Sequence, residues 1–164
     1  MARRRDASAG TPATVLLEKA GVTFAVRAYE HDPRAASFGL EAADALGVDP
    51  SRVLKTLVVE ADGGLAVAVV PVDTHLDLKA VARALGAKKA QMADPAAAER
   101  SSGYVVGGIS PLGQRRPLPT VVDASASAWD TVLVSGGRRG LDLELSPHDL
   151  VTLTSATLAD VARR

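Results

Sequence analysis

The sequence predicts an α+β domain built round a curved, mostly mixed β-sheet. Its 164 residues correspond to one domain of ordinary size, and a chain of this length can bury a core without metal ions or disulfides. About seven short segments have the pattern of strands, and five have the pattern of short helices. Because the two kinds are mixed unevenly, the regular alternation of a doubly wound parallel sheet is not favoured.

The first third of the chain predicts a helix, a strand and a second helix. Pro12 stands where a helix can begin without losing a hydrogen bond, and apolar residues follow it at helical spacing. Residues 22–29 alternate as a half-buried strand does, with Tyr29 on the polar face. After a loop, Ser37 can cap a helix that runs to Gly47.

The middle of the chain predicts a β-hairpin followed by two helices. Residues 53–60 and 65–72 are rich in β-branched side chains and are separated by a turn that contains two glycines. The second strand is apolar on both faces, so we expect it to be central in the sheet. An amphipathic helix over 77–85 and an alanine-rich helix over 94–100 follow.

The last third predicts four short strands and a final helix. The strands are expected at 104–106, 120–122, 131–135 and 141–145. The Gly136-Gly137 pair permits the tight connection between the last two of them. Ser146 followed by Pro147 is a typical helix start, and residues 158–161 are expected to give this helix a packing partner.

The composition excludes several classes of function. Without cysteine the chain cannot form disulfides, iron–sulfur clusters, cysteine-ligated zinc sites or a thiol nucleophile of its own, which is compatible with the cytoplasm. The formal net charge of zero argues against a general nucleic-acid coat, and we expect no DNA partner. The longest apolar run, residues 65–72, is far shorter than the ~20 residues that span a bilayer. We therefore expect a soluble protein.

The predicted domain occupies residues 11–164, and the first ten residues lie outside it. Arg3, Arg4 and Arg5 are followed by small residues and by no apolar segment, so they are not part of a secretory signal. We expect residues 1–10 to be a disordered basic tail. An arm that touches RNA is the alternative.

No common catalytic or cofactor motif is present. His31, His75 and His148 are scattered along the chain, so no metal site is expected. Ser110 lies in a glycine-rich segment, but Pro111 after it has no N–H to offer an oxyanion, which argues against a serine nucleophile. The glycine motifs of phosphate and dinucleotide sites are absent, and no cofactor is expected.

Two features of the sequence are candidate functional groups because of their residue types and spacing. Lys55 shares a strand face with apolar residues, either as an edge lysine that reaches water or as a lysine in a cleft. The amides of Gly107 and Gly108 can approach a ligand and stabilise an oxyanion, unless this segment is a plain loop. Asp142 alternates with apolar neighbours and is expected on a solvated strand face.

Basic pairs recur beside loops and glycines. They stand at positions 88–89, 115–116 and 138–139. In a protein without net charge they form either one focused anion-binding rim or ordinary solubilising charges. The sequence leaves both readings open because it does not show whether the pairs converge.

Five segments resemble the YbaK/EbsC family, and within it the Cys-tRNA(Pro) deacylase branch. These segments, which include VLKTL and GGISPLGQ, lie at 29–33, 53–57, 85–89, 103–114 and 134–142. Each is modest evidence, but five in the family's order are specific. The resemblance extends from about Thr11 to Arg163.

The resemblance implies a strongly curved, barrel-like mixed sheet of about seven strands with flanking helices. It also implies a cytoplasmic trans-editing enzyme, similar to the editing domain of bacterial prolyl-tRNA synthetases, that hydrolyses the ester of tRNA(Pro) wrongly charged with cysteine. The implied partners are the acceptor end of mischarged tRNA(Pro) and prolyl-tRNA synthetase. An Ala-tRNA(Pro) deacylase and a non-catalytic module that binds the tRNA end or a small molecule are the alternatives.

The resemblance further implies a set of site residues. Lys55 is expected to hold the terminal adenosine or its ester, and the N–H of Gly108 to face the ester carbonyl. Further substrate-binding positions are Tyr29, Phe38, Gly107, Ser110, Ser135 and Asp142. Because the chain has no thiol, triad or metal ligands, the hypothesis is that the substrate's own thiol attacks the ester.

Overall fold

The computed structural model describes residues 10–35 and 37–164, so the predicted tail with Arg3 to Arg5 lies outside the described residues. The described chain has five α-helices and ten strands in three sheets. This confirms the α+β class. The three sheets do not close into one barrel, and the strands outnumber the seven expected.

The first sheet is antiparallel, with the order β1-β8-β7. Its strands are β1 (Phe24–Ala28), β7 (Val132–Arg138) and β8 (Leu141–Leu145). The Gly136-Gly137 pair, expected in the connection between β7 and β8, lies within β7 at a bulge after Ser135, and Gly137 there has a φ of 114° that glycine adopts without strain. Helix α1 (Pro12–Ala20) packs on this sheet through Leu17.

The second sheet has five strands in the order β5-β2-β3-β6-β9. They are β2 (Leu54–Ala61), β3 (Gly64–Pro71), β5 (Ala90–Met92), β6 (Thr120–Asp123) and β9 (Thr157–Ala159). The β2–β3 hairpin is antiparallel, while β3–β6 and β6–β9 are parallel, so the sheet is mixed. Strand β3 lies centrally, as its apolar faces predict.

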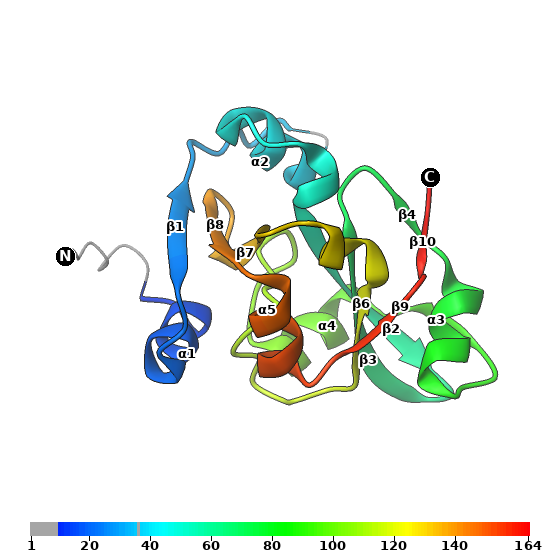
Figure 1. Cartoon of the computed structure of the whole chain (residues 1–164). Helices are drawn as coiled ribbons and strands as arrows, with labels where there is room; N and C mark the ends of the chain where they lie inside the picture. Colours follow the sequence, from blue (N-terminus) through cyan, green and yellow to red (C-terminus); the bar gives the residue numbers. More distant parts are fainter. Residues whose placement is uncertain (1–9, 36) are drawn as a thin grey trace.

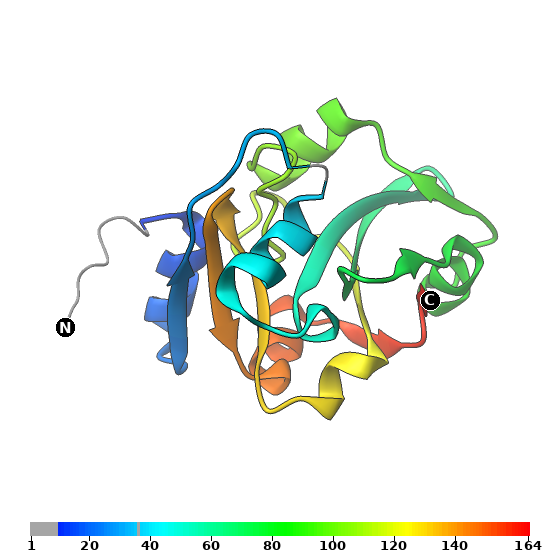
Figure 2. The same cartoon turned by 90° about the horizontal axis from the view of Figure 1, so that it is seen from above.

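The remaining elements cover these two sheets. The helices are α2 (Phe38–Leu46), α3 (Leu78–Leu85), α4 (Pro95–Ser102) and α5 (Pro147–Thr154), with the short 3₁₀ helices η2 (Pro50–Arg52) and η3 (Ala124–Ala128). Ser37 caps α2 through its side chain, and Gly47 ends it in the left-handed region, as predicted. Seen from above, α2 lies between the three-stranded sheet and the β2–β3 hairpin (Figure 2).

The two larger sheets share one hydrophobic core. Leu54 and Val69 of the five-stranded sheet pack in the same cluster as Val134 and Leu143 of the three-stranded sheet. Figure 1 shows the two sheets as the left and right halves of the molecule, with α2 above them. Burial of branched aliphatic side chains from both halves makes the pair of sheets a single structural unit.

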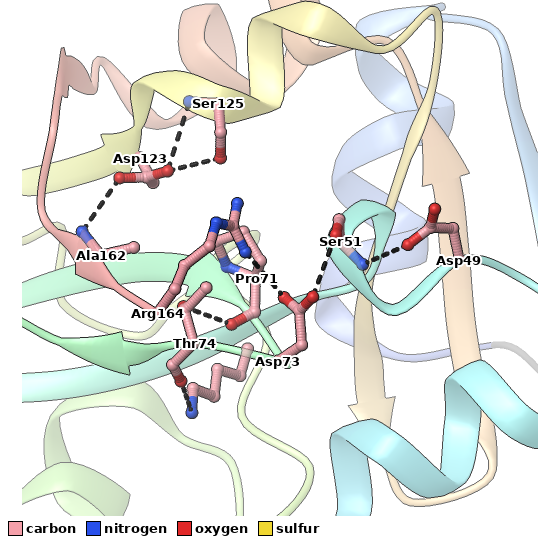
Figure 3. Close-up of polar contacts among 10 residues, drawn as sticks. Asp49, Ser51, Pro71, Asp73, Thr74, Asp123, Ser125, Ala162 and Arg164 are labelled. Carbon is pink, nitrogen blue, oxygen red and sulfur yellow. Dashed lines mark hydrogen bonds and ion pairs between the residues drawn. The ribbon is translucent and has the colours of Figure 1, made fainter.

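The C-terminal segment is tied to the five-stranded sheet by a buried carboxylate. The Oδ1 atom of Asp123 accepts hydrogen bonds from the amides of Val161 (2.9 Å) and Ala162 (3.1 Å), while its Oδ2 atom accepts from Ser125. Figure 3 shows the contacts with Ala162 and Ser125. These bonds guide the chain into β10 (Ala162–Arg163), which pairs with β4 (His75–Leu76).

Two local expectations were wrong. Residues 104–106 form turns and no strand, because Gly103 and Gly107 take positive φ values (83° and 94°) and the Tyr104 hydroxyl donates to the carbonyl of Leu112 (2.7 Å). In the segment 158–161, expected as a packing partner for α5, Leu158 is 44% exposed on β9, and Val161 is buried among residues of the five-stranded sheet and α3 and not in the cluster of Leu150. The strands β4, β5, β9 and β10 were not predicted because two or three residues are too few to show a period.

Candidate functional site

A cavity of about 410 Å³ lies where the two large sheets separate. Its lining comes from β2, the start of α2, the 106–109 loop, the ends of β7 and β8, and the segment from β5 to α4. Branched and small apolar side chains make up most of this lining, with a few polar groups among them. A cavity of this composition is typical of a small-molecule or substrate site.

The cavity exists because one edge of β2 is left unpaired. Val53 makes a bridge to Leu133 of β7, and pairing with β5 begins only at Val59. Between these points, the described part of the chain supplies no strand on the outer side of residues 54–57. The edge of a strand carries main-chain donors and acceptors, so this stretch brings polar backbone to the cavity.

Lys55 lies in the cavity, which favours the cleft alternative over a surface lysine. Its Nζ atom donates to the carbonyl oxygen of Thr74 at 2.7 Å. Burial lowers the pKa of Lys55, and the negative charge of Asp73 acts in the opposite direction. A partly desolvated ammonium interacts more strongly with a polar or anionic ligand than one in water does.

The turn that holds Lys55 is itself well fixed. The buried Thr74 hydroxyl donates to the carbonyl of Pro71 (2.7 Å), and the Asp73 carboxylate accepts from Ser51 (3.0 Å) and pairs with Arg164 (3.4 Å) (Figure 3). The turn that carries the hydrogen-bond acceptor of the ammonium is therefore held by a contact within itself and by contacts with two other segments of the chain.

The glycine-rich loop reaches the same cavity, but through residues other than Gly108. Gly107 and Ile109 line the cavity, and neither amide donates a hydrogen bond to any described residue. The N–H of Gly108, expected to face the ester carbonyl, instead donates to the carbonyl of Val105 (2.9 Å). Gly108 serves close packing, since a Cβ there would lie 2.7 Å from the Cα of Arg138. The amides of Gly107 and Ile109 are thus the candidate oxyanion donors.

Ser110 is fully buried and is not part of the cavity lining. Its hydroxyl accepts from the amide of Leu112 (3.2 Å), and its carbonyl accepts from the side chain of Gln114 (3.0 Å). These contacts make Ser110 a support for the loop, so the structure does not bring it together with the other predicted substrate-binding residues.

Tyr29, Phe38 and Ser135 line the cavity, as the resemblance implies. The guanidinium of Arg139 lies 4.0 Å from the centre of the Phe38 ring, in cation–π geometry, and donates to the carbonyl of Val106 (3.0 Å). This arrangement joins α2 to the glycine-rich loop. Burial raises the pKa of the Tyr29 hydroxyl above its ordinary value.

Asp142 is not on a solvated strand face, and that expectation is corrected. It is 6% exposed and lines the cavity. Burial raises the pKa of its carboxyl to about 7, although the positive charge of Arg27 acts in the opposite direction. The effect of Arg27 is limited because its guanidinium hydrogen-bonds to Glu144 (2.5 Å).

Thr56 is a site residue that the sequence reasoning missed. It lines the cavity at the unpaired edge of β2, and its hydroxyl is buried without a hydrogen-bond partner. Buried hydroxyls normally have partners, so this one is available to a bound ligand. In the sequence, the only sign that Thr56 belongs to the site was its position directly after Lys55. Threonine is too common in strands for that sign to be informative.

A second missed feature is a polar network that links the two sheets beside the cavity. We call it the Glu144 network: Glu144 on β8, Arg27 on β1, Arg52 before β2, and Thr131 before β7. Arg52 donates to the Thr131 carbonyl (2.7 Å) and to the Glu144 carboxylate. The hydrogen bond that Thr131 donates is the largest cause that lowers the pKa of Glu144, and the two arginines lower this pKa further.

Of the three basic pairs, only 138–139 meets the cavity. Arg138 contributes to the lining, whereas Lys88, Lys89, Arg115 and Arg116 are exposed elsewhere. Within the ranges that the structure describes, no group of three or more His, Asp or Glu side chains is placed to hold a metal ion. The helices of those ranges are also too short or too polar to cross a bilayer.

Known proteins resemble this chain in sequence. A family model described as the aminoacyl-tRNA editing domain matches residues 32–153. The "Putative Cys-tRNA(Pro)/Cys-tRNA(Cys) deacylase EbsC" of Enterococcus faecalis is 37% identical over 123 residues, which cover 74% of this chain and 75% of that protein. A proline–tRNA ligase of Moorella thermoacetica is 37% identical over 98 residues, covering 60% of this chain and 17% of the ligase.

The fold points to the same family. A crystal structure of a "putative trans-editing enzyme for prolyl tRNA synthetase" superposes with a TM-score of 0.83 at 27% identity, covering 93% of this chain and 96% of that one. Lys55, the glycine-rich loop and Asp142 all lie inside the range that the family model matches. The chain therefore belongs to the aminoacyl-tRNA editing domain family, as the resemblance of its sequence motifs predicts.

Proposed function

We propose that this protein is a trans-editing deacylase that hydrolyses the ester between cysteine and the 3′ end of mischarged tRNA(Pro). The observation that carries the proposal is the meeting of the Lys55 ammonium with the Gly107 and Ile109 main chain in one cavity. Membership of the editing-domain family supports this reading of the cavity. The names of the relatives point to cysteine as the amino acid and to tRNA(Pro) as its carrier.

The residues supply binding and charge stabilisation for an ester. The amides of Gly107 and Ile109 would donate to the carbonyl oxygen as negative charge develops there. Lys55 would hold the ester end or the adjoining ribose, and the Thr56 hydroxyl offers one further polar contact. The apolar side chains of Val53, Leu57 and Ile109 leave room for a small amino-acid side chain.

The substrate can supply its own nucleophile. The chain has no cysteine, and Ser110 lies outside the cavity lining. A cysteine thiol, with a pKa of about 8.5, is partly ionised at neutral pH. When its sulfur attacks the ester carbonyl, a C–S bond forms, the C–O bond to the ribose breaks, and the ribose oxygen takes up a proton. Water then opens the strained thiolactone to give free cysteine.

The basic residues beside the cavity suit a tRNA end. Arg138 lines the cavity, and Arg139 lies over Phe38 at its margin. Cations at these positions can pair with the phosphates that precede the terminal adenosine. Because the whole protein has no net charge, we infer that it grips chiefly the acceptor end, and that prolyl-tRNA synthetase contributes the selection of tRNA(Pro).

The proposal is tested by incubating the protein with tRNA(Pro) charged with cysteine, alanine or serine and measuring the release of each amino acid. We expect cysteine to be released fastest. Lys55→Ala should lower the rate by a factor of about 100 or more, whereas Lys89→Ala, which removes an exposed lysine outside the cavity, should leave it unchanged.

The other outcomes identify the alternatives. Preferential release of alanine would make the protein an Ala-tRNA(Pro) deacylase. Retardation of the tRNA in a gel without release of any amino acid would make it a binding module. Equal release of cysteine and serine would exclude the thiol-dependent step, because a hydroxyl cannot replace a partly ionised thiol.

A further inference from the structure

Cleavage of the ester leaves the ribose oxygen in need of a proton. An alkoxide is a poor leaving group at neutral pH, and a positioned acid of suitable strength accelerates such a step. The cavity offers few candidates. Lys55 donates to the Thr74 carbonyl, and burial makes the Tyr29 hydroxyl a weaker acid than usual. Among the described residues that line the cavity, Asp142 carries the only carboxyl group.

Asp142 is fixed in the middle of the three-stranded sheet. It lies opposite Arg27 on β1 and opposite Ser135 on β7, so both neighbouring strands hold its backbone. Its side chain is almost fully buried and yet lines the cavity. No described residue forms a hydrogen bond with its carboxyl group, which leaves both oxygens available to a bound substrate.

The charged groups around Asp142 do not force it to ionise. Arg27 faces it from β1, but the Arg27 guanidinium is hydrogen-bonded to Glu144, two residues further along β8. Arg138 from β7, Tyr29 from the end of β1 and Lys55 from β2 line the same cavity. The carboxylate that acts on Lys55 is Asp73, not Asp142. A buried carboxyl without a dedicated cation keeps its proton to higher pH.

We propose that the Asp142 carboxyl group is the general acid that protonates the ribose oxygen as it leaves the ester. This inference rests on the proposed deacylase function. The C–O bond breaks as the Asp142 O–H proton passes to the ribose oxygen. The resulting carboxylate then takes up a proton from solvent water. The proton that the substrate thiol released earlier has gone to the same solvent, so the protons balance. Lys55 on β2 and Asp142 on β8 thus act on the ester from the two sheets that border the cavity.

The pH dependence distinguishes this role from simple binding. Burial raises the pKa of Asp142 to about 7, so the acid form is progressively lost above neutral pH. Attack by the substrate thiol becomes faster over the same range, as more of it ionises. The rate of the wild-type protein should therefore rise up to about pH 7, stay nearly level between the two pKa values, and fall only above about pH 8.5, giving a bell-shaped profile with a broad top.

The experiment compares wild type with Asp142→Asn on Cys-tRNA(Pro). It measures kcat and KM between about pH 5.5 and about pH 10, a range that extends beyond the pKa values of both the carboxyl and the thiol. Asparagine has the shape of the protonated acid and no proton to transfer. We expect kcat to fall by a factor of about 100 to 1,000 with little change in KM. The falling limb above about pH 8.5 should disappear, so that the variant's rate rises until the thiol is ionised and then stays level. Asp130→Asn, at an exposed position, is the matched control.

A second substrate keeps the test independent of folding. Cysteine phenyl ester has a leaving group that needs no proton from an acid, so Asp142→Asn should hydrolyse it within a few-fold of the wild-type rate. The proposal is overturned if the variant keeps the falling limb, or if it loses both substrates equally. If the wild-type protein does not release cysteine from tRNA(Pro), the deacylase function itself fails. If wild type and Asp142→Asn release cysteine at equal rates, Asp142 is not the general acid, but the deacylase function stands.

Discussion

At the scale of single residues, Asp142 shows that the site is built at a cost to stability. Its pKa is raised from 3.8 to about 7 by burial. Between these values the folded protein binds more protons than the unfolded chain, so the free energy of unfolding falls as pH rises from about 4 to 7. The shift corresponds to an unfavourable contribution of up to about 4 kcal/mol at and above neutral pH.

Asp142→Asn should therefore stabilise the protein, in a pH-dependent way. We expect the variant to unfold at higher urea concentration than wild type at pH 8, by up to about 4 kcal/mol, because it removes a buried charge. The difference should shrink on acidification and vanish near pH 4, where the wild-type carboxyl is protonated in both states. Urea unfolding at several pH values measures this. A difference that does not depend on pH would show that Asp142 is not the buried titrating group.

At the scale of elements, the glycine-rich loop is placed by contact between two backbones. Gly108 lies directly against β7, and a Cβ on it would approach the Cα of Arg138 to 2.7 Å and its carbonyl carbon to 3.1 Å. No side-chain rotation relieves a contact with main-chain atoms. The small size of residue 108 thus positions the neighbouring amides of Gly107 and Ile109 at the cavity.

Gly108→Ala should move the loop and lower both stability and activity. We expect a loss of about 1–3 kcal/mol in the free energy of unfolding, as for other overpacked sites, together with a lower deacylation rate. Gly64→Ala is the control, because the nearest atom to its added Cβ would be 3.8 Å away. Unfolding curves and rates of the two variants give the comparison. Equal stability of Gly108→Ala and wild type would contradict the close packing of the loop on β7.

At the scale of the whole molecule, the cavity depends on the relative position of two sheets. The sheets share a core and one bridge, Val53 to Leu133, and the Glu144 network lies beside that bridge. The Glu144 carboxylate pairs with Arg27 from β1 and with Arg52 from η2, just before β2. Removing the carboxylate would leave two partly buried cations without their partner.

Glu144→Ala should weaken the contact between the two sheets and should weaken substrate binding. We expect a destabilisation of about 1–3 kcal/mol at neutral pH and a higher KM for Cys-tRNA(Pro). The pKa of Glu144 is lowered in the folded protein, so its contribution is present at neutral pH and is lost as pH falls through the folded-state value. Unfolding curves at pH 7 and below pH 4 test this, with exposed Glu18→Ala as control. Unchanged stability at pH 7 would rule out a role in joining the sheets.

Local patterns predicted most elements, because they are made by neighbouring residues. The cap of α2 at Ser37, its end at Gly47, the β2–β3 hairpin and the start of α5 at Pro147 all follow from contacts within a few residues. The two-residue strands and the turns of residues 104–106 were not predictable in this way. Their conformation depends on partners far away in the chain, such as β10 for β4.

The sequence by itself determined the fold class, the order of most elements and the motifs of the editing-domain family. Through those motifs it also singled out Lys55, Tyr29, Phe38 and Ser135, all of which line the cavity. Tertiary structure alone decided that Asp142 is buried, that the Gly108 amide bonds within its turn and that Thr56 has an unpartnered hydroxyl. The physical reason is that periodicity tells which face of a strand a side chain occupies. Whether another element covers that face depends on how the two sheets pack.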